Sequence, residues 1–495
     1  MNAAFCSRWP GGHDGHPQTL QLCKGKLADL STLSVILRHE LTTQWRDGRA
    51  RSVVIIAIAL LAVAAAAAAQ QHAQIATERH HAHEAEWQRW LDQPARNPHS
   101  AAHYGFYVFK PSPPLGLLDP GLDSYLGVST WVEAHWMNDF IHRPAQDEGA
   151  LSRFPTLNPA QMVQTVLPLL LIFLGFASLS GERARGTLRQ LLSLGVAPSR
   201  LAMGKLIGTS TWLLMVLAPA MVIAILGLIY SPKAGEDTLL RFSLWLSFHL
   251  LYLAGWAALV LGVSARMRSP REALTVLLTV WLLVCWILPR VVTEIAAVLH
   301  PLPSSAELRI DLKSSMGEVH SSEQALKVRE RVLAEYGVER TEDLPIDWRG
   351  ISLQEAEEAN YPIFDRHSGA LFAGYRTQDV VLQQAGFLIP TLAMQSISQA
   401  LAGTDLAHHR EFVLAAEAHR RVIQKLMNEN VTLYDREGTD YLADPQLWST
   451  VPRFNYQRPH LAEVLAEVWW AMLAMCFWAG ATAMFAFQQV RSMRL

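Results

Sequence analysis

Six long apolar runs alternate with polar segments along this chain. Each run is close to the roughly 20 residues that an α-helix needs to cross the hydrocarbon core of a bilayer. The pattern therefore predicts an all-α polytopic membrane protein with six transmembrane helices. The predicted spans cover residues 52–69, 159–180, 206–230, 244–264, 273–299 and 467–489.

The polar segments differ greatly in length, and two of them are long enough to fold as domains. Residues 70–158 and 300–466 are predicted to be mainly helical, because apolar side chains recur there every three to four positions. The same spacing in residues 27–51 predicts an amphipathic connecting helix followed by a linker. The other segments are a disordered tail at 1–26, short loops at 181–205, 231–243 and 265–272, and a second tail at 490–495.

Charge is distributed unevenly along the chain, although 42 Lys and Arg against 44 Asp and Glu leave a net charge of only −2. Basic residues dominate the short loops 181–205 and 265–272, whereas acidic residues outnumber them in 70–158 and 300–466. Short loops rich in Lys and Arg stay in the cytoplasm. Both termini are therefore predicted to be cytoplasmic, and the two long segments extracytoplasmic.

The spans and the cysteines exclude several classes of protein. His249 is the only ionisable side chain a few residues inside an apolar run, since Arg241, Arg290, Glu294 and Glu467 lie near the outer ends of the spans; this disfavours an ion-coupled carrier. No G-x-x-x-x-G-K-[ST] phosphate-binding loop occurs, so any ATP that drives this protein must be bound by another subunit. All four cysteines lie outside the two long segments, which must fold without disulfides.

The loop after the second predicted span carries the most informative pattern. Leu188, Leu191 and Leu192 lie on one face of a short helix, Arg183 points elsewhere, and Gly195 ends it. A short amphipathic helix at the membrane surface is suited to docking a partner. The alternative is a basic loop that only fixes orientation, with its leucines along the membrane surface.

Three segments together resemble the permease subunits of ABC type-2 transporters. E-R-A-R-G-T-L-R-Q-L-L-S (182–193) is similar to their coupling-helix loop, and R-H-E-L-T-T-Q-W-R-D-G-R (38–49) is similar to their connecting helix. The stretch P-T-L-A-M-Q-S-I-S-Q-A-L-A-G-T-D-L-A-H-H-R-E-F at 390–412, followed by A-E-A-H-R-R at 416–421, resembles a bacterial subgroup with a large uncharacterised extracytoplasmic domain before the last span. The resemblance implies a multi-pass protein of the bacterial inner membrane.

The resemblance also implies partners and site residues. The permease would pair with a second identical or paralogous permease, contact membrane lipid and bind two copies of an ABC ATPase that holds ATP and Mg. No catalytic residue and no cofactor are then expected in this chain, which would not be an enzyme. The positions that match the loop expected to face the ATPase are Glu182, Arg183, Gly186, Thr187, Leu188, Leu191 and Leu192.

Two functions remain open within this class. The protein would export a substrate with ATP hydrolysed by the separate subunit, or it would relay ATP-driven motion to a periplasmic partner without translocating a substrate. The two long segments exceed what a bare pore requires, and we expect them to pack on each other across a dimer.

A weaker alternative is a membrane-anchored metal-binding protein or hydrolase. His80, His83 and Glu84 are weak metal-ligand candidates, because His80 and Glu84 are spaced to share one helix face. Two ligands on one face are too few for a tight site, and a solvated polar helix is the ordinary interpretation. Nothing in the sequence predicts a nucleic-acid partner.

Overall fold

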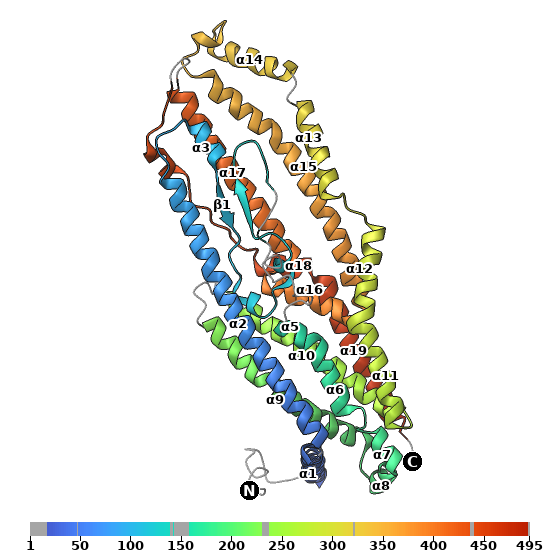
Figure 1. Ribbon diagram of the computed structural model, residues 1–495. Coiled ribbons are helices and arrows are strands. Elements are labelled where there is room, and N and C mark those ends of the chain that lie inside the picture. The colour runs from blue at the N-terminus through green and yellow to red at the C-terminus, as the bar shows by residue number, and fades with distance from the viewer. Residues whose placement is uncertain are drawn as a thin grey trace.

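The computed structural model describes residues 17–46, 48–138, 142, 158–229, 237–319, 322–435 and 440–493, and most of them are helical. Within these residues, six helical segments are long and apolar enough to cross a membrane, as the sequence predicts. They form a bundle from which a long polar region extends at one end (Figure 1). The segments are Arg51–Leu91, Pro159–Arg185, Pro198–Ile229, Thr238–Arg266, Pro270–Leu299 and Trp469–Arg491.

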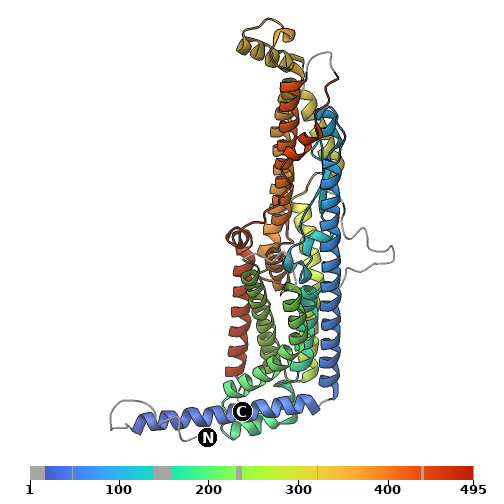
Figure 2. The ribbon, with the colours of Figure 1, turned by 90° about the vertical axis from the view of Figure 1, so that its left-hand side faces the viewer.

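Helix α2 (Gly48–Leu91) runs without a break from one end of the bundle far into the polar region (Figures 1 and 2). Residues 53–69 form an unbroken apolar stretch, and the residues after it are mainly polar, although Trp87 and Trp90 among them are buried. Neither Gly nor Pro interrupts it after Gly48, so nothing in its sequence ends the helix at the edge of the apolar stretch. The helix that contains the first span therefore continues beyond residue 70.

The other spans vary in regularity. Helices α9 (Pro198–Ile229), α10 (Thr238–Arg266) and α19 (Trp469–Arg491) are continuous. The second span, α5 (Pro159–Gln161) to α6 (Leu167–Gly175), and the fifth, α11 (Pro270–Leu282) to α12 (Leu288–Leu299), each contain a π-helical turn just before Pro168 or Pro289. Proline cannot donate to the preceding turn, and the wider turn accommodates it.

Helix α1 (Pro17–Arg46) lies across the base of the bundle, roughly perpendicular to the spans (Figure 2). The prediction of a disordered tail over 1–26 is wrong for residues 17–26, which belong to this helix; residues 1–16 lie outside the described residues. Proline favours the first helical position, because its missing N–H would have no intrahelical partner there. The connecting helix therefore starts at Pro17, ten residues before residue 27, where the apolar pattern that predicted it begins.

We call the polar region beyond the bundle, residues 70–138 and 300–467, the distal domain. It contains the short helix α3 (Pro98–Tyr104) and one antiparallel pair of strands, β1 (Phe106–Phe109) and β2 (Ser129–Val132), with Phe106 opposite Val132. The sequence did not predict this pair. The rest is mainly helical, as predicted: α13 (Ser305–Val319), α14 (Ser322–Tyr336), α15 (Trp348–Ala385), α16 (Pro390–Ala402), α17 (Leu406–Tyr434) and α18 (Leu461–Glu467).

The two long polar segments share one hydrophobic core within a single chain. Trp90 and Phe106 from the first segment pack with Phe412 and Trp448 from the second, and all four side chains are buried. The indole N–H of Trp90 donates to the carbonyl of Trp448 at 3.0 Å, and that of Trp448 donates to the carbonyl of Gln93 at 3.1 Å. The prediction of two separate domains that meet across a dimer is therefore corrected: they form one domain inside one protomer.

Helix α16 joins the distal domain to the spans. Ten of its residues are buried, and it packs in the same hydrophobic core as α10 and α19. The Ser398 hydroxyl donates to Asp119 at 2.5 Å and accepts from the indole N–H of Trp245 at 2.9 Å. Burial raises the pKa of Asp119 to about 6, although hydrogen bonds from Ser398 and the Gly121 amide act in the opposite direction.

Candidate functional site

The loop between the second and third spans folds into two short helices at the end of the bundle opposite the distal domain. Helix α7 (Ser180–Arg185) and helix α8 (Thr187–Ser193) meet at Gly186, whose φ of 79° lies in the left-handed region. Glycine adopts that region without steric cost, so the chain can reverse sharply there. The reversal brings the Thr187 hydroxyl within hydrogen-bonding contact of the Glu182 carboxylate.

Lys205 connects this loop to α1 and α9. Its Nζ lies 2.8 Å from Glu40 Oε2 on α1 and 3.4 Å from Glu182 Oε1 on α7, and the Glu40 carboxylate also accepts a hydrogen bond from Gln44 at 2.9 Å. The side chains of Lys205 and Glu40 are only 6% and 10% exposed. An ion pair this far from water depends on both partners, because removing one leaves a buried charge uncompensated. We call Glu40, Glu182 and Lys205 the proximal ion network.

Two glycines on α9 let α1 approach closely enough to form this network. A Cβ at Gly204 would lie 2.5 Å from Ile36 Cγ2, and one at Gly208 would lie 2.9 Å from Glu40 Cγ. Gly204 and Gly208 are four residues apart, the spacing at which small residues allow helices to pack backbone to backbone. The position of α1 is therefore determined by α9 and by the network.

Arg183 attaches the loop to the end of α10. Its guanidinium donates to the carbonyl of Ala265 at 2.6 Å and to that of Met267, at the end of α10. The last carbonyls of a helix lack intrahelical partners and carry partial negative charge, so a cation is stabilised there. The Ser264 hydroxyl also accepts from the amide of Leu179 at 3.0 Å, just before α7. The loop is thus attached to α1, α9 and α10 together.

The structure changes which loop residues can face a partner. Leu188 is only 6% exposed and packs in a cluster with Leu179, Leu201 and Leu261, with Leu191 and Leu192 half-buried at its edge. Glu182 also points into its own chain. The prediction that Leu188 and Glu182 face an ATPase groove is therefore corrected, because their apolar and ionic partners lie within this protomer. The exposed residues of α7, α8 and the turn that follows them are Ala184, Arg185, Gly186, Arg189, Gln190, Ser193, Leu194 and Gly195.

Leu194 is the prominent apolar residue of this surface. Its side chain is 80% exposed, next to Arg189 and Gln190 on the outer face of α8. Burying a leucine from that state is worth roughly 1.5–3 kcal/mol. The exposed face of the loop, with one leucine and two arginines, is a docking surface of mixed apolar and basic character.

Sequence reasoning identified Glu182, Arg183, Gly186 and Thr187 but missed Glu40 and Lys205. One signal was present: Glu40 and Gln44 follow Leu33 and Ile36 at helical spacing, so two polar residues fall on the apolar face of α1. A polar residue on a buried face implies a polar partner. The pattern could not say that the partner would be Lys205, which lies 165 positions later.

In the part of the chain that the structure describes, the predicted metal candidates His80, His83 and Glu84 do not form a group of three converging donor atoms. His80 is exposed, and Glu84 pairs with Arg453 at 2.6 Å. His249, on α10, is buried, packs against the ring of Trp245 and lies 2.8 Å from the Trp245 carbonyl through Nδ1, as a hydrogen-bonded core histidine does.

Residues 305–457 match a protein family described as a domain of unknown function, DUF3526. No curated protein matches this chain. The matched region runs from the first residue of α13 almost to the start of α18 and contains none of the six candidate spans. The family match therefore concerns the distal domain, at the opposite end of the molecule from the α7–α8 loop.

Proposed function

We propose that this protein is the membrane-embedded subunit of an ATP-driven ABC type-2 transporter and that a separate ATPase docks on the outer face of the α7–α8 loop. The observation that carries the proposal is the proximal ion network, which joins the loop to α1 and α9 through buried charges. A loop that only fixed membrane orientation would need basic residues but no buried attachment to two other helices.

The network and Arg183 give the proposed ATPase a mechanical connection to the spans. Force applied to α8 reaches α9 through Lys205 and reaches the end of α10 through Arg183. Packed interiors and paired charges transmit displacement because they deform little before they switch arrangement. Export of a substrate would then follow from movement of the second, third and fourth spans against the rest of the bundle.

A cavity in the distal domain supports an exported cargo of amphiphilic character. It has a volume of about 740 Å³ and is lined mainly by aromatic and aliphatic side chains, with the amide of Asn138 and the ring of His367 among them. Ligand cavities of this size commonly combine apolar walls with a few polar groups that set orientation. Its aromatic lining comprises Tyr107, Trp131, Trp136, Phe364, Phe372 and Tyr375.

A second function, transmission of motion without transport, is favoured by the connection between spans and distal domain. Arg241, at the first turn of α10 and only 1% exposed, donates to the carbonyl of Pro459 at 2.6 Å and approaches His408 at 3.4 Å. Together with α16 and the unbroken α2, this contact makes the distal domain follow the spans. Such a domain would present ATP-driven movement to a periplasmic partner.

The docking surface is tested by copurification. Full-length protein with an affinity tag is expressed with a candidate ABC ATPase, and the amount of ATPase retained is measured for the wild type, Leu194→Asp and Leu326→Asp. Leu194→Asp places a charge in the apolar part of the contact and should reduce retention at least tenfold. Leu326 is an exposed leucine on α14 in the distal domain, so the matched Leu326→Asp protein should retain the ATPase fully.

Two outcomes would reject the proposal: equal retention by all three proteins, or loss of retention only in Leu326→Asp. Export and transmission are then separated in proteoliposomes that contain the complex and a fluorescent amphiphile. Export requires ATP-dependent accumulation of the amphiphile that Trp136→Ala weakens, because Trp136 lines the cavity. Transmission requires ATP hydrolysis without accumulation.

A further inference from the structure

Three histidines of the distal domain converge on one point. Among the described residues, His99, His103 and His135 form the one group of three metal-ligating side chains whose donor atoms all lie within 4.8 Å of one another. His99 and His103 are one helical turn apart on α3, and His135 comes from the segment just after β2. Sequence separation hid this group, because α3 and that segment meet only in the folded chain.

His99 and His103 of α3 are placed as two ligands of one metal ion would be. His99 Nε2 and His103 Nε2 face each other at 3.1 Å. Metal–nitrogen bonds of about 2.0–2.1 Å in a tetrahedral site put ligand nitrogens roughly 3.4 Å apart. The Asn97 side chain caps α3 by accepting from the His99 amide at 3.0 Å, which fixes the first turn that carries His99.

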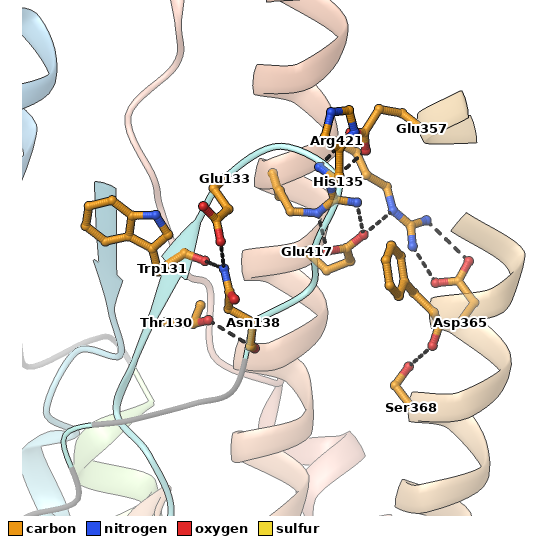
Figure 3. Close-up of polar contacts among 12 residues, drawn as sticks. Thr130, Trp131, Glu133, His135, Asn138, Glu357, Asp365, Ser368, Glu417 and Arg421 are labelled. Carbon is orange, nitrogen blue, oxygen red and sulfur yellow. Dashed lines mark hydrogen bonds and ion pairs between the residues drawn. The ribbon is translucent and has the colours of Figure 1, made fainter. Parts of the chain in front are cut away.

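His135 is held in an unusual backbone conformation. Its φ is 70°, in the left-handed region that residues other than glycine rarely adopt. Both its backbone amide and its Nδ1 lie 2.7 Å from Glu357 Oε1, so one buried carboxylate fixes both the backbone and the ring (Figure 3). With Nδ1 bonded to Glu357, the other ring nitrogen, Nε2, is left as the donor for a ligand.

Glu357 is itself firmly positioned. It is fully buried and accepts from Arg420 Nη1 at 2.9 Å, while Arg420 also makes a two-pronged contact with Glu417, at 2.8 and 2.9 Å. Burial alone would raise the pKa of Glu357, but hydrogen bonds from His135 and Arg420 and the charge of Arg420 lower it to about 2. A carboxylate that orients a histidine through Nδ1 is the usual second layer of a histidine metal site.

His103 is exposed, so the group is open to solvent on one side. That opening provides an entry path and room for a fourth ligand such as water.

We propose that His99, His103 and His135 form a binding site for a transition-metal dication of the Zn²⁺ type. Three imidazole nitrogens suit Zn²⁺, whereas Ca²⁺ and Mg²⁺ require oxygen ligands. The bound ion would join α3 to the segment after β2 and, through Glu357, to α15 and α17. The proposal is independent of any ATPase partner.

Zn²⁺ binding to the full-length protein tests the proposal. Protein with a histidine-free tag is stripped with chelator in detergent, and Zn²⁺ binding is measured by isothermal titration calorimetry. The wild type should bind one equivalent with micromolar or tighter affinity. His103→Ala should weaken that affinity at least tenfold, and Glu357→Gln about tenfold, as loss of an outer-layer partner does. His80→Ala, which removes an exposed histidine of α2, is the matched control and should bind like the wild type.

Thermal melting without metal verifies that each variant is folded, and His103 is a suitable position because its side chain is exposed. Stripped protein loaded with Co²⁺ should show the intense visible bands of a four-coordinate site, and His103→Ala should lose them. The proposal is overturned if the wild type binds no Zn²⁺ at micromolar concentration. It is also overturned if His103→Ala binds as the wild type does, or if His80→Ala is the variant that loses binding.

Discussion

The two ends of this molecule bury charge in different ways. At the proximal end, Lys205 lies between two carboxylates supplied by other helices, Glu40 of α1 and Glu182 of α7, and the network borders the exposed α7–α8 loop. In the distal domain, the buried guanidinium of Arg420 makes a two-pronged contact with Glu417 and donates one hydrogen bond to Glu357. The first network joins separate elements at a surface, and the second fixes one rigid interior.

This difference indicates different roles for the two ends. A lysine ammonium is a point charge on a flexible stem and can keep its partners through small shifts of a loop. A guanidinium makes directional contacts that specify one arrangement. The proximal network is therefore suited to an element that moves with a partner, and the distal network to a site whose geometry must stay constant.

The largest expected effect comes from breaking the distal network. Arg420→Met leaves Glu357 and Glu417 buried with much of their charge uncompensated, which should cost about 3–5 kcal/mol of folding free energy. Thermal melting and limited proteolysis of the purified protein should show a distal domain that unfolds early. Arg340→Met removes an arginine whose side chain is 68% exposed in its pair with Asp343 and should leave the melting curve unchanged. An Arg420→Met protein that melts like the wild type would show that the distal network does not fix the interior of the distal domain.

Breaking the proximal network should have a smaller and more local effect. Lys205→Met should cost about 2–3 kcal/mol, because Glu182 keeps its hydrogen bond from Thr187 and lies nearer to solvent. Hydrogen exchange should rise in α1 and α7 while the distal domain stays protected. Lys205→Arg keeps the charge and is the matched control. Equal exchange in Lys205→Met and the wild type would show that the network does not hold the loop.

The smallest effect is expected at the turn between α7 and α8. Gly186→Ala forces a side chain into the left-handed region at φ 79°, with no neighbouring atom within 4 Å, so strain alone should cost about 1–2 kcal/mol. Gly317→Ala, in helix α13 with equally open surroundings and no positive φ, should be neutral or slightly stabilising. Melting temperatures of the two variants compare them directly. A Gly186→Ala protein as stable as Gly317→Ala would mean that the turn relaxes.

The sequence was sufficient to predict the membrane part of the fold. Six apolar runs correspond to the six candidate spans, and the pattern around Leu188 correctly indicated a short helix with a buried face. These features are local, because the length of a run and the spacing of its leucines are properties of one segment. The continuation of α2 beyond residue 70 is also a local feature, because neither Gly nor Pro follows Gly48 within the helix.

Contacts between distant segments could not be predicted. Glu40 and Lys205 are separated by two spans, and His99 is brought to His135 only by the strand pair and the packing of α3. The error in assigning Leu188 to a partner groove has the same origin: amphipathic spacing shows that one face is buried but not which protein buries it. The sequence likewise could not show that two acidic segments far apart in the chain share one core.

The central claim is that the α7–α8 loop docks a cytoplasmic ATPase while the distal domain lies on the other side of the membrane. Single cysteines at Ser193, on the exposed end of α8, and at Ser449, exposed in the distal domain, test both parts in a cysteine-free background. An impermeant thiol reagent applied to intact spheroplasts should label the protein with Ser449→Cys and not that with Ser193→Cys. In opened membranes, Ser193→Cys should react only after the ATPase has been removed. Labelling of Ser193→Cys from outside intact spheroplasts, or equal labelling with and without bound ATPase, would contradict the account.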